Sequence, residues 1–201
     1  HEPLHFEDLF GTLHFDWDAD TFRIGSGLLT TQGEEGQAKV LFGLTIPRLP
    51  NDIGIEMDLF VGLQNANAIH RAKYIPYVLD PALSTWLSNS IGEGRIEQGA
   101  FLWRGSLRHG AAPLRTIQLA FNVADTDLRY HPQWPAVRLQ QGIVVIDDSA
   151  VSVWAERASL FASTVERLSA ETRLNAQGQI ELALAGRVLG PAADGLKVLN
   201  E

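Results

Sequence analysis

The side chains best suited to catalysis or metal binding are scattered along this sequence. There is no cysteine, and the six histidines are His1, His5, His14, His70, His109 and His131. A zinc site requires several ligands, usually at short helical or hairpin spacing. Only His1 and His5, at the start of the chain, are spaced in that way. The sequence therefore predicts no metal site.

Acidic residues form two short clusters. Asp16, Asp18 and Asp20 have the alternate spacing that opens a calcium-binding loop, but Thr21 stands where such a loop needs glycine and Gly27 where it needs glutamate. Asp147 and Asp148 are adjacent, so in a strand their carboxylates would point to opposite faces. Both clusters are therefore predicted to be turns, in which aspartate is common.

Sequence motifs of the common enzyme classes are absent. The chain has no phosphate-binding glycine loop with lysine, no HExxH and no GxSxG. A hydrolase that uses His70 or His131 with a nearby aspartate is the remaining catalytic reading, and no spacing supports it. We expect a protein that is not an enzyme and needs no cofactor.

Composition narrows the class of protein further. The chain has 201 residues, 45% of them hydrophobic, and a net charge of -8. This length is sufficient for a substantial core. The acidic balance argues against nucleic acid as a partner, because phosphate backbones are bound by clustered Lys and Arg. No stretch approaches the roughly 20 apolar residues of a membrane helix. The chain begins at His1 without a methionine or signal-type start, and we expect a piece of a longer protein.

Most of the chain has the period-two alternation that is typical of half-buried strands. Val40, Phe42, Leu44 and Ile46 alternate until Pro47. The strands are predicted at residues 5–16, 22–30, 40–46, 55–63, 117–123, 137–146, 151–155, 158–163, 165–174 and 179–188. Polar or glycine-containing turns are predicted at 18–20, 32–36, 125–127 and 147–149. Such short connections favour antiparallel pairing between consecutive strands.

The pattern changes between residues 65 and 93. Apolar residues from Ala68 to Val78 fit a helix that Pro76 ends or kinks. Asp80 and Pro81 then provide an N-cap and a first helical position, and Gly92 and Gly94 end this second helix. Its apolar stripe consists of Leu83, Trp86, Leu87 and Ile91. Residues 95–107, which contain Gly99 and Gly105, are predicted to form a short strand pair bent at glycine.

These elements predict a mainly β fold: a large, curved, groove-like antiparallel meander with a short insertion of two helices. The predicted divisions are a β meander over 1–64, the helical insertion over 65–93, a second β meander over 94–190 and a trailing linker over 191–201, all in one structural domain. The five tryptophans are predicted to lie in the core. A sheet with one apolar face must cover it with a second sheet, a helix, a partner or a lipid, and the pattern alone leaves these four open.

Two segments carry a resemblance to a known family. The first combines a tyrosine and a proline, a short helix of the form L..WL and a glycine-rich run: Tyr74, Pro76, Leu83, Trp86, Leu87, Gly94, Ile96, Gly99, Phe101, Gly105 and Leu107. The second is a Y.P.WP segment: Tyr130, Pro132, Trp134 and Pro135. In these residues the chain resembles the YhdP group of AsmA-like proteins, over about residues 65–174.

The resemblance implies a function without catalytic residues. AsmA-like proteins of Gram-negative bacteria look like long β gutters, anchored in the inner membrane, that cross the periplasm. Their apolar inner face is thought to conduct phospholipid toward the outer membrane and so to maintain it. This chain lacks the anchoring helix, so we expect a periplasmic segment of such a gutter, with phospholipid acyl chains as ligand and other envelope proteins as further partners.

The predicted lipid contacts are the inward residues of two strands: Ile55, Met57, Leu59, Val61, Ile117, Leu119, Phe121 and Val123. Acyl chains that lie against such a row leave water, at a gain of about 0.8 kcal/mol per CH₂ group. The alternative is a non-catalytic β-rich scaffold or assembly module whose apolar face is fully packed. A closed core would favour the scaffold, and an open apolar groove would favour the lipid.

Overall fold

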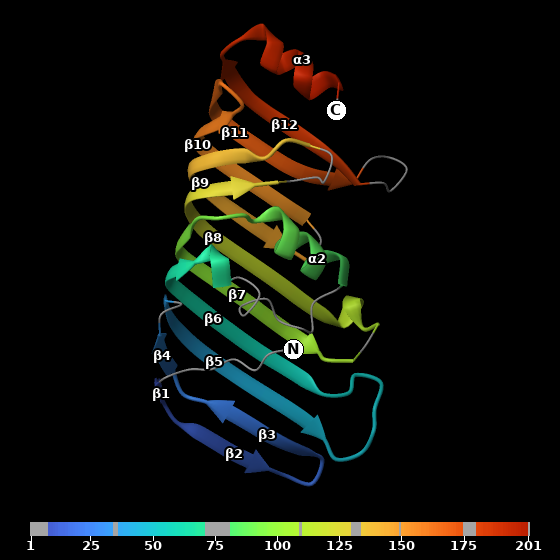
Figure 1. The fold of residues 1–201 in the computed structure, drawn as a ribbon. Coiled ribbons are helices and arrows are strands. Elements are labelled where there is room, and N and C mark those ends of the chain that lie inside the picture. Colours follow the sequence, from blue (N-terminus) through green and yellow to red (C-terminus); the bar gives the residue numbers. More distant parts are fainter. Residues whose placement is uncertain are drawn as a thin grey trace.

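The chain folds around one large antiparallel sheet, as the computed structural model shows (Figure 1). The structure describes residues 8–33, 36–70, 81–108, 110–129, 134–148, 150–174 and 180–200. Its strands are β1 (Asp8–Phe10), β2 (Leu13–Trp17), β3 (Thr21–Ser26), β4 (Leu29–Gly33), β5 (Gly36–Pro47), β6 (Glu56–Asn67), β7 (Arg95–Ser106), β8 (Arg115–Leu128), β9 (Val137–Asp147), β10 (Ala150–Leu160), β11 (Ser163–Leu174) and β12 (Ile180–Leu189). The predicted mainly β, curved antiparallel fold is confirmed.

Sequential pairing runs through most of the sheet. From β5 to β12 each strand pairs with the next one along the chain. At the other end β5 is long enough to take two partners, β4 along its first half and β3 along its second half. β1 then pairs with β4, and β2 with β3. The sheet is open, because among the described strands β12 pairs only with β11.

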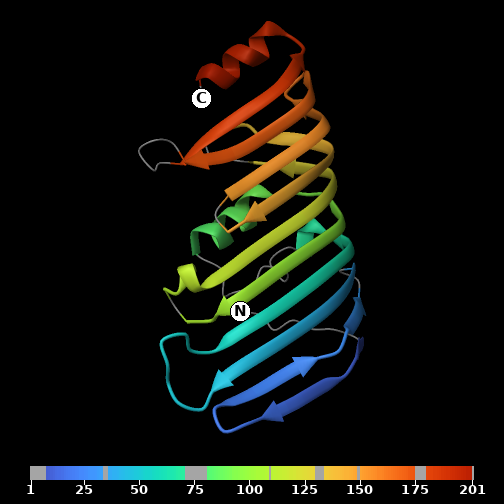
Figure 2. The same ribbon diagram turned by 180° about the vertical axis from the view of Figure 1, so that it is seen from behind.

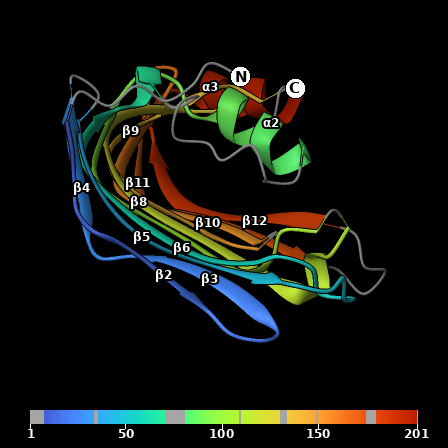
Figure 3. The ribbon, with the colours of Figure 1, turned by 90° about the horizontal axis from the view of Figure 1, so that it is seen from below.

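The sheet curves into a gutter, and its helices lie on the concave side (Figure 3). Irregular positions recur at corresponding places in neighbouring strands. Asn65, Asp125 and Arg167 have positive φ angles of 50 to 52°, and register shifts occur in β7 between Ile96 and Gln98 and in β10 around Arg157. β-bulges bend a strand and increase its twist. These bulges therefore explain why long strands curve instead of forming a flat sheet.

The bulges also account for several wrong predictions. The turn predicted at 125–127 is a bulge inside the continuous strand β8, and the strands predicted at 151–155 and 158–163 are one strand, β10. The strand pair predicted over 95–107 is the single strand β7. Conversely, the strand predicted at 22–30 is divided into β3 and β4.

The helical insertion is partly as predicted. Helix α2 (Pro81–Ser90) begins at the predicted proline, and a short 3₁₀ helix, η1 (Ala68–His70), precedes it. Residues 65–67, predicted as helical, are the end of β6. The rest of the first predicted helix, at 71–80, lies outside the described residues, as do Tyr130 and Pro132 of the second motif.

The predicted trailing linker is wrong for most of its length, since Ala192–Asn200 form helix α3. Asp194 fixes this helix to the turn between β10 and β11. Its carboxylate accepts hydrogen bonds from the Ser163 hydroxyl at 2.8 Å and from the Ala162 backbone N–H at 3.1 Å, and it is almost fully buried. A second 3₁₀ helix, η2 (Ala112–Leu114), leads into β8.

Candidate functional site

The side chains that face the concave side form one apolar surface across the sheet, called the concave face below. Residues that pair directly across antiparallel strands share a face. One such row crosses β5 to β9 and consists there of Val40, Val61, Phe101, Leu119 and Ile146. The next row is Phe42, Leu59, Trp103 and Ile117. The register thus places the predicted residues of β6 and β8 on the same face.

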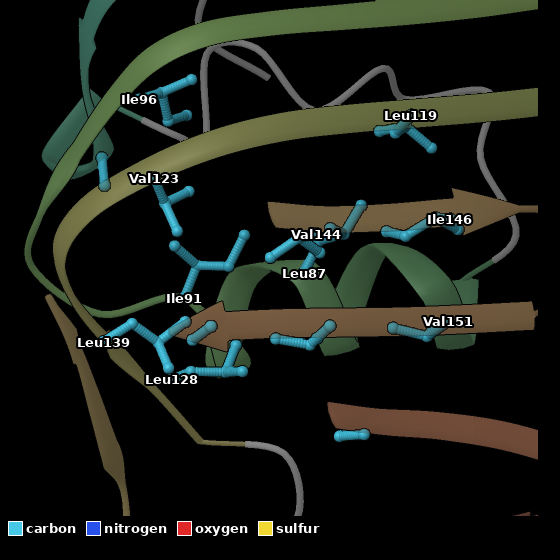
Figure 4. Close-up of a cluster of buried hydrophobic side chains, with 14 of the residues drawn as sticks. Leu87, Ile91, Ile96, Leu119, Val123, Leu128, Leu139, Val144, Ile146 and Val151 are labelled. Atoms are coloured by element: carbon cyan, nitrogen blue, oxygen red, sulfur yellow. The ribbon is translucent and has the colours of Figure 1, made fainter. Parts of the chain in front are cut away.

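The middle of the concave face is closed by helix α2. Leu87 and Ile91 of α2 are buried and belong to the same apolar cluster as the strand residues below them. Figure 4 shows both side chains directed toward Val123, Leu128, Leu139 and Val144. The helix therefore acts as the second layer that a one-sided sheet requires.

The eight predicted lipid contacts lie in and around this closed region. Ile117, Leu119 and Val123 are buried members of the cluster. Met57, Leu59, Val61 and Phe121 are half-buried and pack against it. Ile55 precedes β6 and is 40% exposed. In this arrangement the three buried residues contribute to the core, and the half-buried ones border it.

Backbone hydrogen bonds hold the C-terminal end of α2 at the rim of the sheet. The Gly92 N–H donates to the Asp127 carbonyl at 2.7 Å, and the Asp127 N–H donates to the Glu93 carbonyl at 3.0 Å. The Arg129 N–H donates to the Ser90 carbonyl at 2.7 Å. Gly94 has a φ of 149°, and a Cβ there would overlap Thr126. The predicted stop glycines therefore also allow the chain to approach β8 closely.

The concave face continues beyond α2 and is open at its N-terminal end. Leu13, Phe15 and Trp17 on β2 are 53%, 57% and 72% exposed. They pair with Ser26, Ile24 and Phe22 of β3, which in turn lie beside β5. Phe15 stacks on Phe22 with 6.4 Å between ring centroids. We call Leu13, Phe15, Trp17, Phe22 and Ile24 the open apolar surface.

The C-terminal end of the concave face is also exposed. Leu184 and Val188 on β12 are 55% and 58% exposed, and their partners on β11, Ala170 and Val165, are buried members of the cluster. An apolar path therefore runs along the gutter, covered in the middle and open toward both ends of the sheet.

The open apolar surface is not among the predicted lipid contacts. Leu13 and Phe15 lie in the strand predicted at 5–16, and Trp17 is one of the five tryptophans predicted to lie in the core. Trp103 is fully buried as predicted, whereas Trp17 is exposed and Trp134 and Trp154 are 38% and 39% exposed. The sequence pattern does not indicate where α2 packs on the sheet, and the exposure of each strand residue depends on that packing.

The turn beside the open apolar surface is organised by one carboxylate. Asp18 accepts hydrogen bonds from the backbone N–H groups of Asp20 at 2.9 Å and Thr21 at 2.8 Å, and from the Arg23 guanidinium at 2.9 Å. The backbone donors, and then Arg23, hold the pKa of Asp18 well below its usual range. The predicted turn at 18–20 is confirmed, and its aspartates have structural roles.

This lowered pKa predicts an acid-sensitive hairpin. Because the folded-state pKa lies below the unfolded one, the Asp18 carboxylate stabilises the fold at neutral pH, and that contribution is lost as the pH falls below the usual aspartate value of 3.8. Between about pH 5 and pH 2, the thermal midpoint of the natural protein should fall further than that of the Asp18→Asn variant. Parallel pH curves for the two proteins would contradict this assignment.

The described residues offer little other chemistry. Among them, no group of three His, Asp or Glu side chains lies close enough to hold a metal ion. The histidines at 1, 5, 109 and 131 lie outside the described residues. No helix in the described ranges has both the length and the apolar character needed to cross a membrane.

The described residues thus form an open, one-sided β gutter whose apolar concave face is partly covered by a packed helix. The chain matches the family described as YhdP protein over residues 1–201, and it belongs to this family of AsmA-like proteins. The family suggests a protein of the cell envelope. No curated protein and no solved structure matches the chain.

Proposed function

We propose that the concave face binds phospholipid acyl chains, and that this chain is a periplasmic, non-catalytic segment of a conduit between the inner and outer membranes. The observation that carries the proposal is the open apolar surface. Leu13, Phe15 and Trp17, all more than half exposed, continue the face that α2 covers further along. Exposed apolar patches of this kind mark binding surfaces.

The geometry suits an acyl chain better than a compact ligand. The concave face is apolar along rows that cross many strands. A site for a small molecule is typically an enclosed cavity in which a few converging polar groups fix the orientation. An acyl chain gains from each CH₂ group that leaves water, and its head group stays hydrated. Such a surface lets a lipid move along it.

The covered middle of the face supports a second function, the non-catalytic scaffold or assembly module. The cluster under α2 is closed, as that function predicts. The exposed ends of the same face are not explained by it, unless a protein partner covers them. A bound phospholipid can be extracted with organic solvent and a bound protein cannot, so the two functions can be distinguished.

The test is to purify the chain under native conditions, extract it with organic solvent and identify the extract by mass spectrometry. We expect phospholipid to co-purify at a fixed ratio to protein. The delipidated protein should then take up a fluorescent phospholipid from vesicles. A well-folded chain that carries no phospholipid and takes none up would refute the proposal and leave the scaffold function.

A further inference from the structure

The convex side of the sheet carries a shallow hollow that the lipid proposal does not use. Its central residues are Ile143 on β9 and Trp154 on β10, which pair directly across the two strands and are 47% and 39% exposed. Their neighbours in register, Val144 and Val153, are buried on the concave face. Ile143 and Trp154 therefore face the convex side. Figure 2 shows the sheet from this side, with the strands in front of α2.

The hollow is shallow and open to solvent. Its volume is about 480 Å³, and Asn122, Gln141, Glu156 and Arg167 line it together with Ile143 and Trp154. A smaller depression of about 380 Å³ adjoins it and shares Gln141, Glu156 and Arg167. The two form one continuous trough across β8, β9, β10 and β11, which we call the convex trough.

The bulges of the sheet form this trough. Glu156 lies at the register shift of β10, and Arg167 lies at that of β11. Arg167 has a φ of 51°, which is unfavourable for a side chain of this size. Backbone strain of this kind persists where the surrounding structure imposes it, and it is frequent at functional sites.

The polar side chains of the trough are available to a ligand. Asn122, Gln141, Glu156 and Arg167 make no side-chain hydrogen bond or ion pair with any other residue that the structure describes. Two pairs on β8 and β9 differ in this respect: Arg138 binds Asp127 at 3.1 Å, and Gln118 binds Asp147 at 2.9 Å. The trough thus combines an exposed indole with two free amides, a free carboxylate and a free guanidinium.

We infer that the convex trough binds an uncharged oligosaccharide. Sugar rings present C–H groups that pack on an indole face, and hydroxyls that both donate and accept hydrogen bonds. Amides, a carboxylate and a guanidinium can match these hydroxyls. The charges nearly cancel, with Glu97, Glu156 and Glu166 against Arg157 and Arg167, so a polyanion gains little there. The polar lining does not suit acyl chains. This site lies on the face opposite the proposed lipid path and is independent of it.

The test uses the full 201-residue chain and isothermal titration with tetrasaccharides of glucose, mannose, galactose and N-acetylglucosamine. We expect at least one to bind saturably, with a Kd below about 5 mM. Trp154→Ala and Gln141→Ala should each weaken that binding by about tenfold. Phe60→Ala is the matched control, because Phe60 is a 47% exposed aromatic residue that lies away from the trough.

Gln141→Ala removes only an exposed side chain, so this variant tests the binding site even if Trp154→Ala does not fold. Binding that is unchanged in Gln141→Ala and in Trp154→Ala would place the sugar elsewhere and overturn the inference. So would the absence of saturable binding for all four sugars, or tighter binding of an uncharged peptide than of any sugar. Phospholipid uptake should be the same in all these variants, so a failure here leaves the lipid proposal intact.

Discussion

Trp103→Ala is expected to destabilise the protein more than truncation of any of the exposed aromatic side chains. Trp103 is fully buried at the centre of the concave face, between Leu59 of β6 and Ile117 of β8. The Arg115 guanidinium lies 4.9 Å from the ring centroid. Removing the indole leaves a cavity that the surrounding strands cannot fill, at a cost of about 3–5 kcal/mol in the free energy of unfolding. Urea denaturation followed by circular dichroism measures this loss.

Trp154→Ala provides the matched comparison on the other face. Its indole is 39% exposed and fills no enclosed space, so the loss should be only about 1–2 kcal/mol. Equal losses for the two variants would mean that the concave face is not the better packed of the two. That result would remove the basis for distinguishing a core under α2 from the open ends.

Much of the fold could be predicted because one face of the sheet is apolar. Period-two alternation identified β5, β6, β9 and β11, and the short turns identified their antiparallel order. The alternation fails at bulges, where one extra residue changes the phase of the pattern. Asp125 is an instance: aspartate tolerates positive φ both in turns and in bulges, so a bulge inside β8 was interpreted as the end of a strand.

The remaining errors involve contacts between residues distant in sequence. Helix α3 is short, and a helix of that length is marginal by itself. Its position depends on the bonds from Ser163 and Ala162 to Asp194, which no local pattern contains. The same applies to the candidate site. The register correctly places Leu59 and Leu119 on one face, but only the packing of Leu87 and Ile91 determines which part of that face remains open.

The largest functional effect is expected from the double variant Phe15→Asp with Trp17→Asp. Both side chains belong to the open apolar surface, and both are more than half exposed, so the fold should be retained. Two carboxylates would displace a stretch of acyl chain from the surface. If about four CH₂ groups lose their contact, binding weakens by about 3 kcal/mol, a fall in affinity of about a hundredfold. Transfer of a fluorescent phospholipid from vesicles to the delipidated protein measures the change.

Phe60→Asp is the control for this variant. Phe60 pairs with Leu41 and Leu102 on the convex side of the sheet, and it is 47% exposed. The substitution introduces one carboxylate, against two in the β2 variant, into a comparably exposed aromatic site. Any general effect of lost hydrophobicity or added charge should therefore appear in Phe60→Asp at about half the size. If lipid follows the concave face, only the β2 variant loses uptake. Equal losses in both would indicate non-specific adsorption, and no loss in either would show that the exposed end of the gutter does not contact lipid, which favours the scaffold function.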